Sequence, residues 1–236
     1  NGPYCTGQTI QLLGTTNATG TNITYAWSGP GGFTSDVQNP TNATLPGTYT
    51  LIVSVDACSS EPAVTDVIFN APPNGTASNT GPYCAGETIQ LNGNTLTSGT
   101  VISYAWNGPN GYTSSVQNPT DASAPGLYTL VVTVDGCNSP NANTSVIINS
   151  LPQPVISGQP SFCTGFSSIL DAGVGYASYA WSDASVNQTL EVFTSGTFIV
   201  TVTDINGCTG QASFAVTEMA SLTPVITGTL SFCEGS

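Results

Sequence analysis

The stretch Tyr25–Cys58 reads YAWSGPGGFTSDVQNPTNATLPGTYTLIVSVDAC, and it decides the fold because the chain repeats it. Residues 104–137 read YAWNGPNGYTSSVQNPTDASAPGLYTLVVTVDGC, which is identical at 23 of 34 positions without a gap. A shorter version follows at 179–208, as YAWSDASVNQTLEVFTSGTFIVTVTDINGC. Self-similarity over this length predicts a tandem array of small domains, so the function must be one that an array can perform.

Cysteines mark the start of each repeat, and they are spaced 79, 79 and 70 residues apart, at Cys5, Cys84, Cys163 and Cys233. The predicted domains are 1–72 (a first repeat lacking its first strand), 73–151, a shorter 152–219, and 220–236 as the first strand of a fourth repeat. The last assignment depends on residues 223–233, TPVITGTLSFC, which resemble QPVISGQPSFC at 153–163. Because the sequence has no initiator Met, we expect a piece of a longer mature polypeptide.

The charge balance excludes several classes of function. The chain contains no Lys, Arg or His against 13 acidic residues. A surface without cations does not bind phosphate, so we expect no nucleic acid partner, and the absence of a long apolar run predicts no membrane insertion. Without His or Lys there is also no ordinary general base or Schiff-base former. We therefore expect no enzyme in this chain and no cofactor.

Alternating apolar and polar residues predict short strands throughout. The clearest strand is 48–55, TYTLIVSV, which places Tyr49, Leu51 and Val53 on one face. Further strands are predicted over 9–13, 23–28, 63–69, 88–91, 102–107, 127–134, 144–148, 168–171, 178–182, 188–192, 197–203 and 212–217. No segment has helical periodicity. Six or seven short strands in 70 to 80 residues predict an all-β fold of antiparallel sandwiches.

One tryptophan occupies the same place in each repeat, at Trp27, Trp106 and Trp181. Such a ring either forms a platform for a sugar or fills the core of a sandwich. The core interpretation is preferred, because the pattern Tyr-Ala-Trp puts Tyr and Trp on one face of a strand. A second set of aromatic residues opens the strongest strand and resembles a structural tyrosine corner: Tyr49, Tyr128 and Phe198.

Together these motifs resemble a known type of repeat. The pattern C-x-G-x-x-x-x-L, then Y-x-W, then GTYTLIVSV and an Asp shortly before a Cys is similar to the PKD-like and immunoglobulin-like repeats of secreted Bacteroidota proteins. Such repeats fill large surface adhesins, including gliding-motility adhesins, and proteins exported by the type IX pathway. The resemblance implies tandem Ig-like or PKD-like β-sandwich domains arranged end to end, an extracellular or cell-surface location, adhesive or spacer work, and no catalytic residues.

The cysteines predict disulfides, because neither His nor a C-x-x-C pair is present for zinc. Cys5 precedes the second strand of its repeat and Cys58 follows the sixth, and in an antiparallel sandwich these strands run in the same direction. The two cysteines of one repeat then lie at opposite ends, beyond the roughly 7 Å between Cα atoms that a disulfide spans.

In a head-to-tail array, the far end of one repeat abuts the near end of the next. This favours Cys5–Cys137 and Cys84–Cys208, with partners outside the chain for Cys58, Cys163 and Cys233. The alternative is pairing within each repeat, as Cys5–Cys58, Cys84–Cys137 and Cys163–Cys208, or free thiols.

Acidic residues recur before the second cysteine of each repeat, at Asp56, Asp135 and Asp204. They either bind Ca²⁺, which prefers carboxylate oxygens, or form turns, and the turn is preferred.

The leading functional hypothesis is a structural or adhesive stalk of a large surface protein or filament. The partners expected are neighbouring repeats of the same chain, surface glycans or other cells, and laterally associated copies. A second hypothesis is an array of glycan-binding modules that uses Phe33 and Tyr112, each in a Gly-rich turn. A third is a spacer of a secreted hydrolase.

Overall fold

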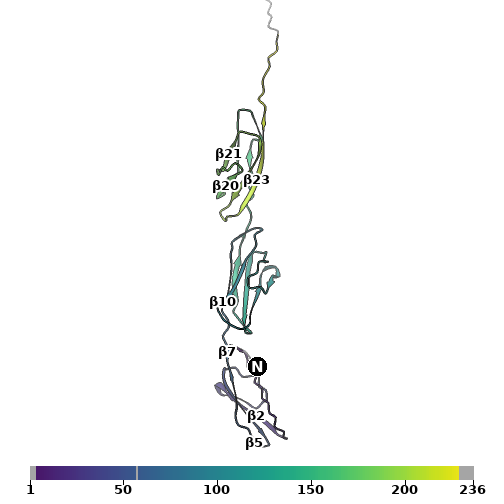
Figure 1. Cartoon of the computed structure of the whole chain (residues 1–236), viewed down its shortest axis with the longest axis vertical. Helices are drawn as coiled ribbons and strands as arrows, with labels where there is room; N and C mark the ends of the chain where they lie inside the picture. Colours follow the sequence, from purple (N-terminus) through teal and green to yellow (C-terminus); the bar gives the residue numbers. More distant parts are fainter. Residues whose placement is uncertain (1–3, 57, 229–236) are drawn as a thin grey trace, which may run out of the picture. The chain divides into compact units, whose positions relative to one another are not determined.

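Short β-strands make up almost all of the regular structure in the computed structural model, which describes residues 4–56 and 58–228 (Figure 1). The only helical segments among these residues are two three-residue 3-10 turns, Pro30–Gly32 (η1) and Pro109–Gly111 (η2). Within the same ranges, no helix has the length and hydropathy needed to cross a membrane. The fold is therefore all-β.

The chain divides into two compact units. One extends to Tyr83 and also includes Thr88–Ile147. It holds the first repeat, which we call copy 1 (residues 4–70), and most of the second, which we call copy 2 (residues 75–149). The other unit combines Cys84–Glu87 with the chain from Ile148 onward, and it holds copy 3 (residues 157–219). Each copy has the strands of an antiparallel Ig-like sandwich.

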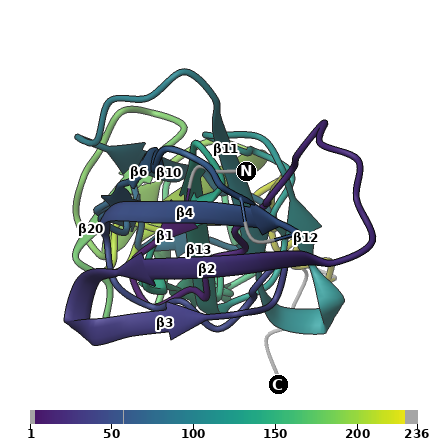
Figure 2. The same ribbon diagram turned by 90° about the horizontal axis from the view of Figure 1, so that it is seen from below.

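Copy 1 is built around one five-stranded sheet. Its strand β2 lies between β3 and β4, as Figure 2 shows, and Trp27 on β2 is paired with Leu51 on β4. Strands β5 and β6 pair with β4 as well. The strands are β1 (Tyr4–Cys5), β2 (Ile23–Gly29), β3 (Phe33–Ser35), β4 (Gly47–Val55), β5 (Cys58–Ser59), β6 (Ala63–Val67) and β7 (Phe69–Asn70).

Copy 2 repeats this sheet and adds a strand pair that copy 1 does not have among the described residues. The sheet has the order β12-β11-β13-β14, with β15 also on β13, and the added pair is β8 with β10. The strands are β8 (Gly75–Asn79), β9 (Tyr83–Cys84), β10 (Leu91–Thr95), β11 (Ile102–Asn107), β12 (Thr113–Ser114), β13 (Gly126–Val134), β14 (Cys137–Asn138), β15 (Ala142–Val146) and β16 (Ile148–Asn149).

Copy 3 has two sheets, one ordered β17-β19-β21 and the other β18-β23-β22-β20. Between them Leu170, Trp181 and Val200 form part of a buried core. The strands are β17 (Ser157–Gly158), β18 (Ser161–Cys163), β19 (Ser168–Asp171), β20 (Ser178–Trp181), β21 (Thr189–Val192), β22 (Gly196–Thr203) and β23 (Thr209–Met219).

Most strands predicted from alternation lie within a residue or two of their observed bounds, because one face of each packs on a core. The strand predicted over 9–13 is wrong. That segment has a single bridge, from Ile10 to Ala43, and no further ladder. The strand predicted over 88–91 is displaced to β10, Leu91–Thr95, where β8 pairs with it. Residues 220–228, the described part of the expected first strand of a fourth repeat, are exposed and outside any strand. The rest of that expected strand falls beyond the described residues.

Candidate functional site: the disulfide-linked cysteines

A four-residue turn presents the first cysteine of each copy. In copy 1 the Gln8 N–H donates to the Cys5 carbonyl (3.0 Å), and the Gln8 side-chain oxygen accepts from the Cys5 N–H (2.8 Å). Gly7 has φ +90°, a value that L-residues with side chains rarely adopt. The same turn recurs in copy 2, where Glu87 takes the place of Gln8 and accepts from the Cys84 N–H (2.7 Å). The recurring Cys-x-Gly sequence thus forms a turn that fixes the position of the cysteine.

A hairpin presents the second cysteine. In copy 2 the two-residue turn Asp135–Gly136 has φ of +48° and +82° and joins Val134 to Cys137, which are paired. Two consecutive positive φ values are typical of the tight turn that matches strand twist, and Asp-Gly is a preferred sequence for it. The Cys137 side chain is buried. In copy 3 the loop is longer, and Cys208 is buried in the same way.

The two presented cysteines meet between successive repeats. Cys5 is bonded to Cys137 with Cα atoms 5.5 Å apart, and Cys84 is bonded to Cys208 with Cα atoms 5.6 Å apart. Both bonds agree with the preferred sequence prediction, in which the first cysteine of one repeat joins the second cysteine of the next. Neither bond matches a within-repeat pair, because antiparallel strand order places those two cysteines at opposite ends of a sandwich.

Two further cysteines carry free thiols in the described residues. Cys58 is exposed and Cys163 is half-buried. Cys58 occupies the hairpin position of Cys137, and Cys163 occupies the turn position of Cys5 and Cys84. The prediction that these two bond outside the chain stays a prediction, and Cys233 lies outside the described residues.

Each recurring aspartate ties the loop beside its hairpin. The Asp56 carboxylate accepts from the Thr21 hydroxyl (3.0 Å) and from the Asn22 N–H (3.0 Å). Asp135 accepts from the N–H groups of Thr100 (2.9 Å) and Val101 (2.8 Å). These bonds favour the ionised carboxylate, so the Thr21 hydroxyl above all lowers the pKa of Asp56, and the Val101 N–H lowers the pKa of Asp135.

In copy 3, Asp204 accepts from the N–H groups of Asn206 (2.9 Å) and Cys208 (2.8 Å), as a turn-forming aspartate does. The other hypothesis for these aspartates was Ca²⁺. Within residues 4–56 and 58–228, no three Asp, Glu, Cys or His side chains come together to hold a metal ion.

The tryptophans are core residues. Trp27, Trp106 and Trp181 are all buried, and each indole N–H donates to a main-chain carbonyl, of Gln38 (3.2 Å), Gln117 (3.2 Å) and Asn187 (2.9 Å) respectively. A ring buried in this way satisfies its one polar group internally and presents no face to a sugar.

The corner tyrosines are buried too, and their hydroxyls donate back to the chain four residues earlier. Tyr49 bonds to the Leu45 carbonyl (2.6 Å) and Tyr128 to the Ala124 carbonyl (2.8 Å). Phe198 of copy 3 is half-buried and packs against its core. All three therefore stabilise their sandwiches, in agreement with the structural interpretation.

Phe33 and Tyr112, the candidates for sugar binding, are half-buried and pack edge-on against the corner tyrosines, with ring centroids 5.4 Å apart in both cases. The Tyr112 hydroxyl donates to Asp121 (2.6 Å), and burial followed by this carboxylate raises the pKa of Tyr112 to about 12. No observation here favours glycan binding, because both rings have a structural contact that accounts for their position.

Comparison with known proteins gives similarity only to solved structures. No protein-family model matches the chain, and no curated protein matches it. The N-terminal four Ig domains of Dscam1 isoform 6.9 are 10% identical over 90% of this chain and 73% of that one, with a TM-score of 0.26. Sidekick-1 immunoglobulin domains 1–4 are 14% identical over 91% and 72%, with a TM-score of 0.34.

The N-terminal eight Ig domains of DSCAM isoform 1.30.30 are 13% identical, with a TM-score of 0.30. That match covers 92% of this chain but only 34% of the other protein. At such values the Ig-like assignment rests on the strand order and pairing described above.

Proposed function

We propose that this chain is a non-catalytic, load-bearing segment of an extracellular stalk, in which disulfides tie each sandwich to the next. The observation that carries the proposal is the Cys5–Cys137 bond, which joins copy 1 to copy 2 within one compact unit. Disulfides persist in oxidising surroundings, which supports a location outside the cell. The resemblance to repeats of large bacterial surface proteins and filaments supports the same function. In this proposal the stalk projects another part of the protein, and that part adheres to glycans or other cells.

The two bonds close overlapping loops, and this overlap limits how far the chain can be stretched. Their sequence separations are 132 and 124 residues, and residues 84–137 belong to both loops. Under tension the shortest covalent path crosses from Cys5 to Cys137, runs back along the backbone to Cys84, and crosses again to Cys208. The remaining backbone is shielded from load even when every sandwich has unfolded.

Single-molecule stretching from both ends tests this proposal. The oxidised chain should extend over roughly 85 residue steps and the reduced chain over roughly 235, which at about 3.5 Å per residue gives roughly 300 Å and 820 Å. The double variant Cys84→Ser with Cys208→Ser keeps one bond and should extend over roughly 105 steps. An oxidised wild-type chain that stretches as far as the reduced one would overturn the load-bearing function.

A further inference from the structure

In copy 2, one edge of the five-stranded sheet is only partly paired. The Val101 carbonyl accepts from the Asp135 N–H in the turn after β13 (2.9 Å), and along an antiparallel strand alternate residues bond to the same neighbour. By this alternation, the N–H and C=O groups of Ile102 and Tyr104 on β11 point away from β13. Among the described residues, no main-chain partner meets these groups.

The strand that could cover this edge stops short. β12 ends at Ser114, which lies opposite Trp106. The chain then crosses to the other strand pair, where the Gln117 carbonyl accepts from the Gly93 N–H of β10 (3.1 Å). A hollow of about 570 Å³ remains beside this step, lined by Tyr104, Trp106 and Ser114 among others. The open main-chain groups therefore have space beside them.

The same edge is open in the other two copies. In copy 1, β3 pairs with β2 only from Trp27 onward, so the matching residues Ile23 and Tyr25 lie beyond its reach. In copy 3, β20 is the last strand of its sheet. Copy 2 has a repeat on either side of it in the sequence and still leaves this edge open. The open edge is therefore a property of the repeat itself.

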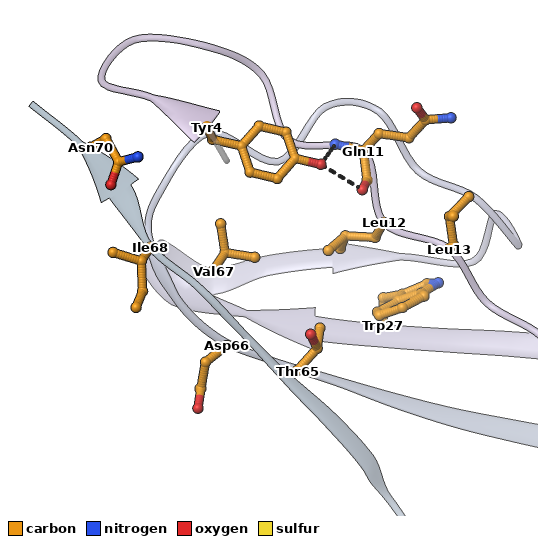
Figure 3. A pocket seen from close by; sticks show the side chains of 10 residues that line it. All are labelled: Tyr4, Gln11, Leu12, Leu13, Trp27, Thr65, Asp66, Val67, Ile68 and Asn70. Carbon is orange, nitrogen blue, oxygen red and sulfur yellow. Dashed lines mark hydrogen bonds between the residues drawn. The ribbon is translucent and has the colours of Figure 1, made fainter. Parts of the chain in front are cut away.

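This edge is distinct from the hollow of about 470 Å³ in copy 1, which Figure 3 shows lined by Leu12, Trp27 and Thr65 among others. Thr65 matches Thr144, to which a side chain of β8 bonds in copy 2. That hollow thus lies where β8 would stand, and by the 79-residue offset the match of β8 would precede Asn1. The β11 edge, in contrast, is open in a repeat that has its β8.

The open edge has none of the features that usually keep sheet edges apart. Edge strands in soluble proteins are commonly protected by a charge, a proline or a covering segment. β11 reads ISYAWN, and none of the five strands of its sheet contains a charged residue or a proline. The far side of the sheet is covered, because Asn79 of β8 donates to the Ser145 carbonyl on β15 (2.9 Å). The β11 side is therefore the one available for a further strand.

We propose that the open edge of β11 is a self-association site, and that its occupant is the same edge of a second copy of this chain, paired antiparallel. A register centred on Ser103 is self-complementary, as a two-fold interface requires. Ile102 of each copy then lies opposite Tyr104 of the other, and each of these pairs exchanges two main-chain hydrogen bonds. Every open group of both edges is satisfied in this way.

The charge distribution favours a second copy as the occupant. The chain carries 13 acidic residues and no cation, so carboxylates face carboxylates wherever two copies meet through their charged surfaces. The sheet of copy 2 brings no charge to the joint, where Ser103 faces Ser103 of the second copy. Ile102, which is 41% exposed, is covered beside the Tyr104 ring, and such aromatic and β-branched pairs stabilise neighbouring strands. The pairing goes beyond the load-bearing function and does not depend on it.

Placing charges at the centre of the register tests the proposal, with the mass of the whole oxidised chain measured against concentration by sedimentation. Wild type should associate, more strongly in high salt because each chain carries a net charge of −13. Ser103→Asp and Ser103→Lys should each weaken association about fivefold or more, because like charges then lie directly opposite each other. An equal mixture of the two variants should restore association, which also shows that both variants fold.

Ser145→Lys is the matched control, because Ser145 is exposed on β15 at the far side of the same sheet. It reduces the negative charge of the chain as much as Ser103→Lys does, and it should not weaken association. A loss confined to Ser103→Lys therefore cannot come from the change in overall charge. Equal behaviour of the two lysine variants, or a mixture that associates no better than its components, would overturn the proposed pairing.

Hydrogen exchange locates the joint. In the associated chain the amides of Ile102 and Tyr104 should gain protection, whereas the amide of Ser103, which already bonds within the sheet, should change little. Protection of Ile23 and Tyr25 without a change in β11 would contradict the assignment to copy 2. A chain that stays monomeric would overturn the second copy as occupant and leave the edge to a different partner.

Discussion

Copies 1 and 2 have nearly the same sequence and different cores. The five-stranded sheet, the corner tyrosine and the buried tryptophan are shared, yet Val53 is 8% exposed where Val132 is fully covered. Ser60 is exposed, whereas its match Ser139 is 7% exposed and its hydroxyl donates to the Pro140 carbonyl (2.8 Å). The difference traces to β8, which covers this side of copy 2, whereas by the 79-residue offset the match of β8 in copy 1 would precede Asn1.

This comparison shows that a strand is made by its partner as much as by its own residues. The segment LNGNT becomes β10 beside β8, and LLGTT in copy 1 keeps the inner bonds and forms no strand. Three predictions test this difference, from the largest effect to the smallest.

Truncating a matched leucine should cost more in the covered copy. Leu130→Ala, at a fully buried site on β13, should lower the free energy of unfolding by about 2–5 kcal/mol. Leu51→Ala should cost clearly less, because Leu51 lines a hollow that is already open and the truncation creates no new enclosed cavity. Urea unfolding followed by hydrogen exchange separately in β13 and β4 measures both, and equal losses would contradict the comparison.

Removing a side chain that anchors β8 should make hydrogen exchange in copy 2 resemble that in copy 1. The Asn79 side chain donates to the Thr144 hydroxyl (2.7 Å) and to the Ser145 carbonyl (2.9 Å), so Asn79→Ala should destabilise copy 2 by about 1–2 kcal/mol. Amides of Leu91–Thr95 should then exchange at rates closer to those of 12–16. Ser78→Ala, on the exposed face of the same strand, is the control and should leave these rates unchanged.

The smallest effect is expected at the aspartate ties, which both copies share. The folded-state pKa values of Asp56 and Asp135 lie below 3.8, so their contribution to stability is present above that pH and is lost as the pH falls through the lower folded values. Carboxyl NMR titration should give both low pKa values. Asp135→Asn should remove the acid response of loop 97–101 while leaving that of Asp56 intact. If both carboxyl groups titrated at the ordinary aspartate pKa, the result would contradict the stabilisation of the ionised carboxylates by these hydrogen bonds.

The sequence predicted the strands that carry an alternating apolar face, and it placed Trp27, Trp106 and Tyr49 correctly in cores. Alternation is visible in a sequence because one face of each such strand is buried. It gave no bounds for β8, and it located the strand at β17 only through the resemblance of 223–233 to 153–163, because the inward residues of both strands are small or few. The Cys-x-Gly turn was quoted as part of a motif without its role being recognised, although a glycine two residues after each of Cys5, Cys84 and Cys163 was a usable signal.

By itself, then, the sequence determined the repeat, the all-β composition, the absence of cationic chemistry and the cysteines available for pairing. The disulfide order followed once strand direction was considered, because direction decides the end of a sandwich at which a residue lies. Only the tertiary structure decided which edges are covered. Main-chain pairing and burial belong to two segments at once, so the pairing of β8 with β10 and the burial of Val132 and Ser139 beside β8 became visible only in the folded chain.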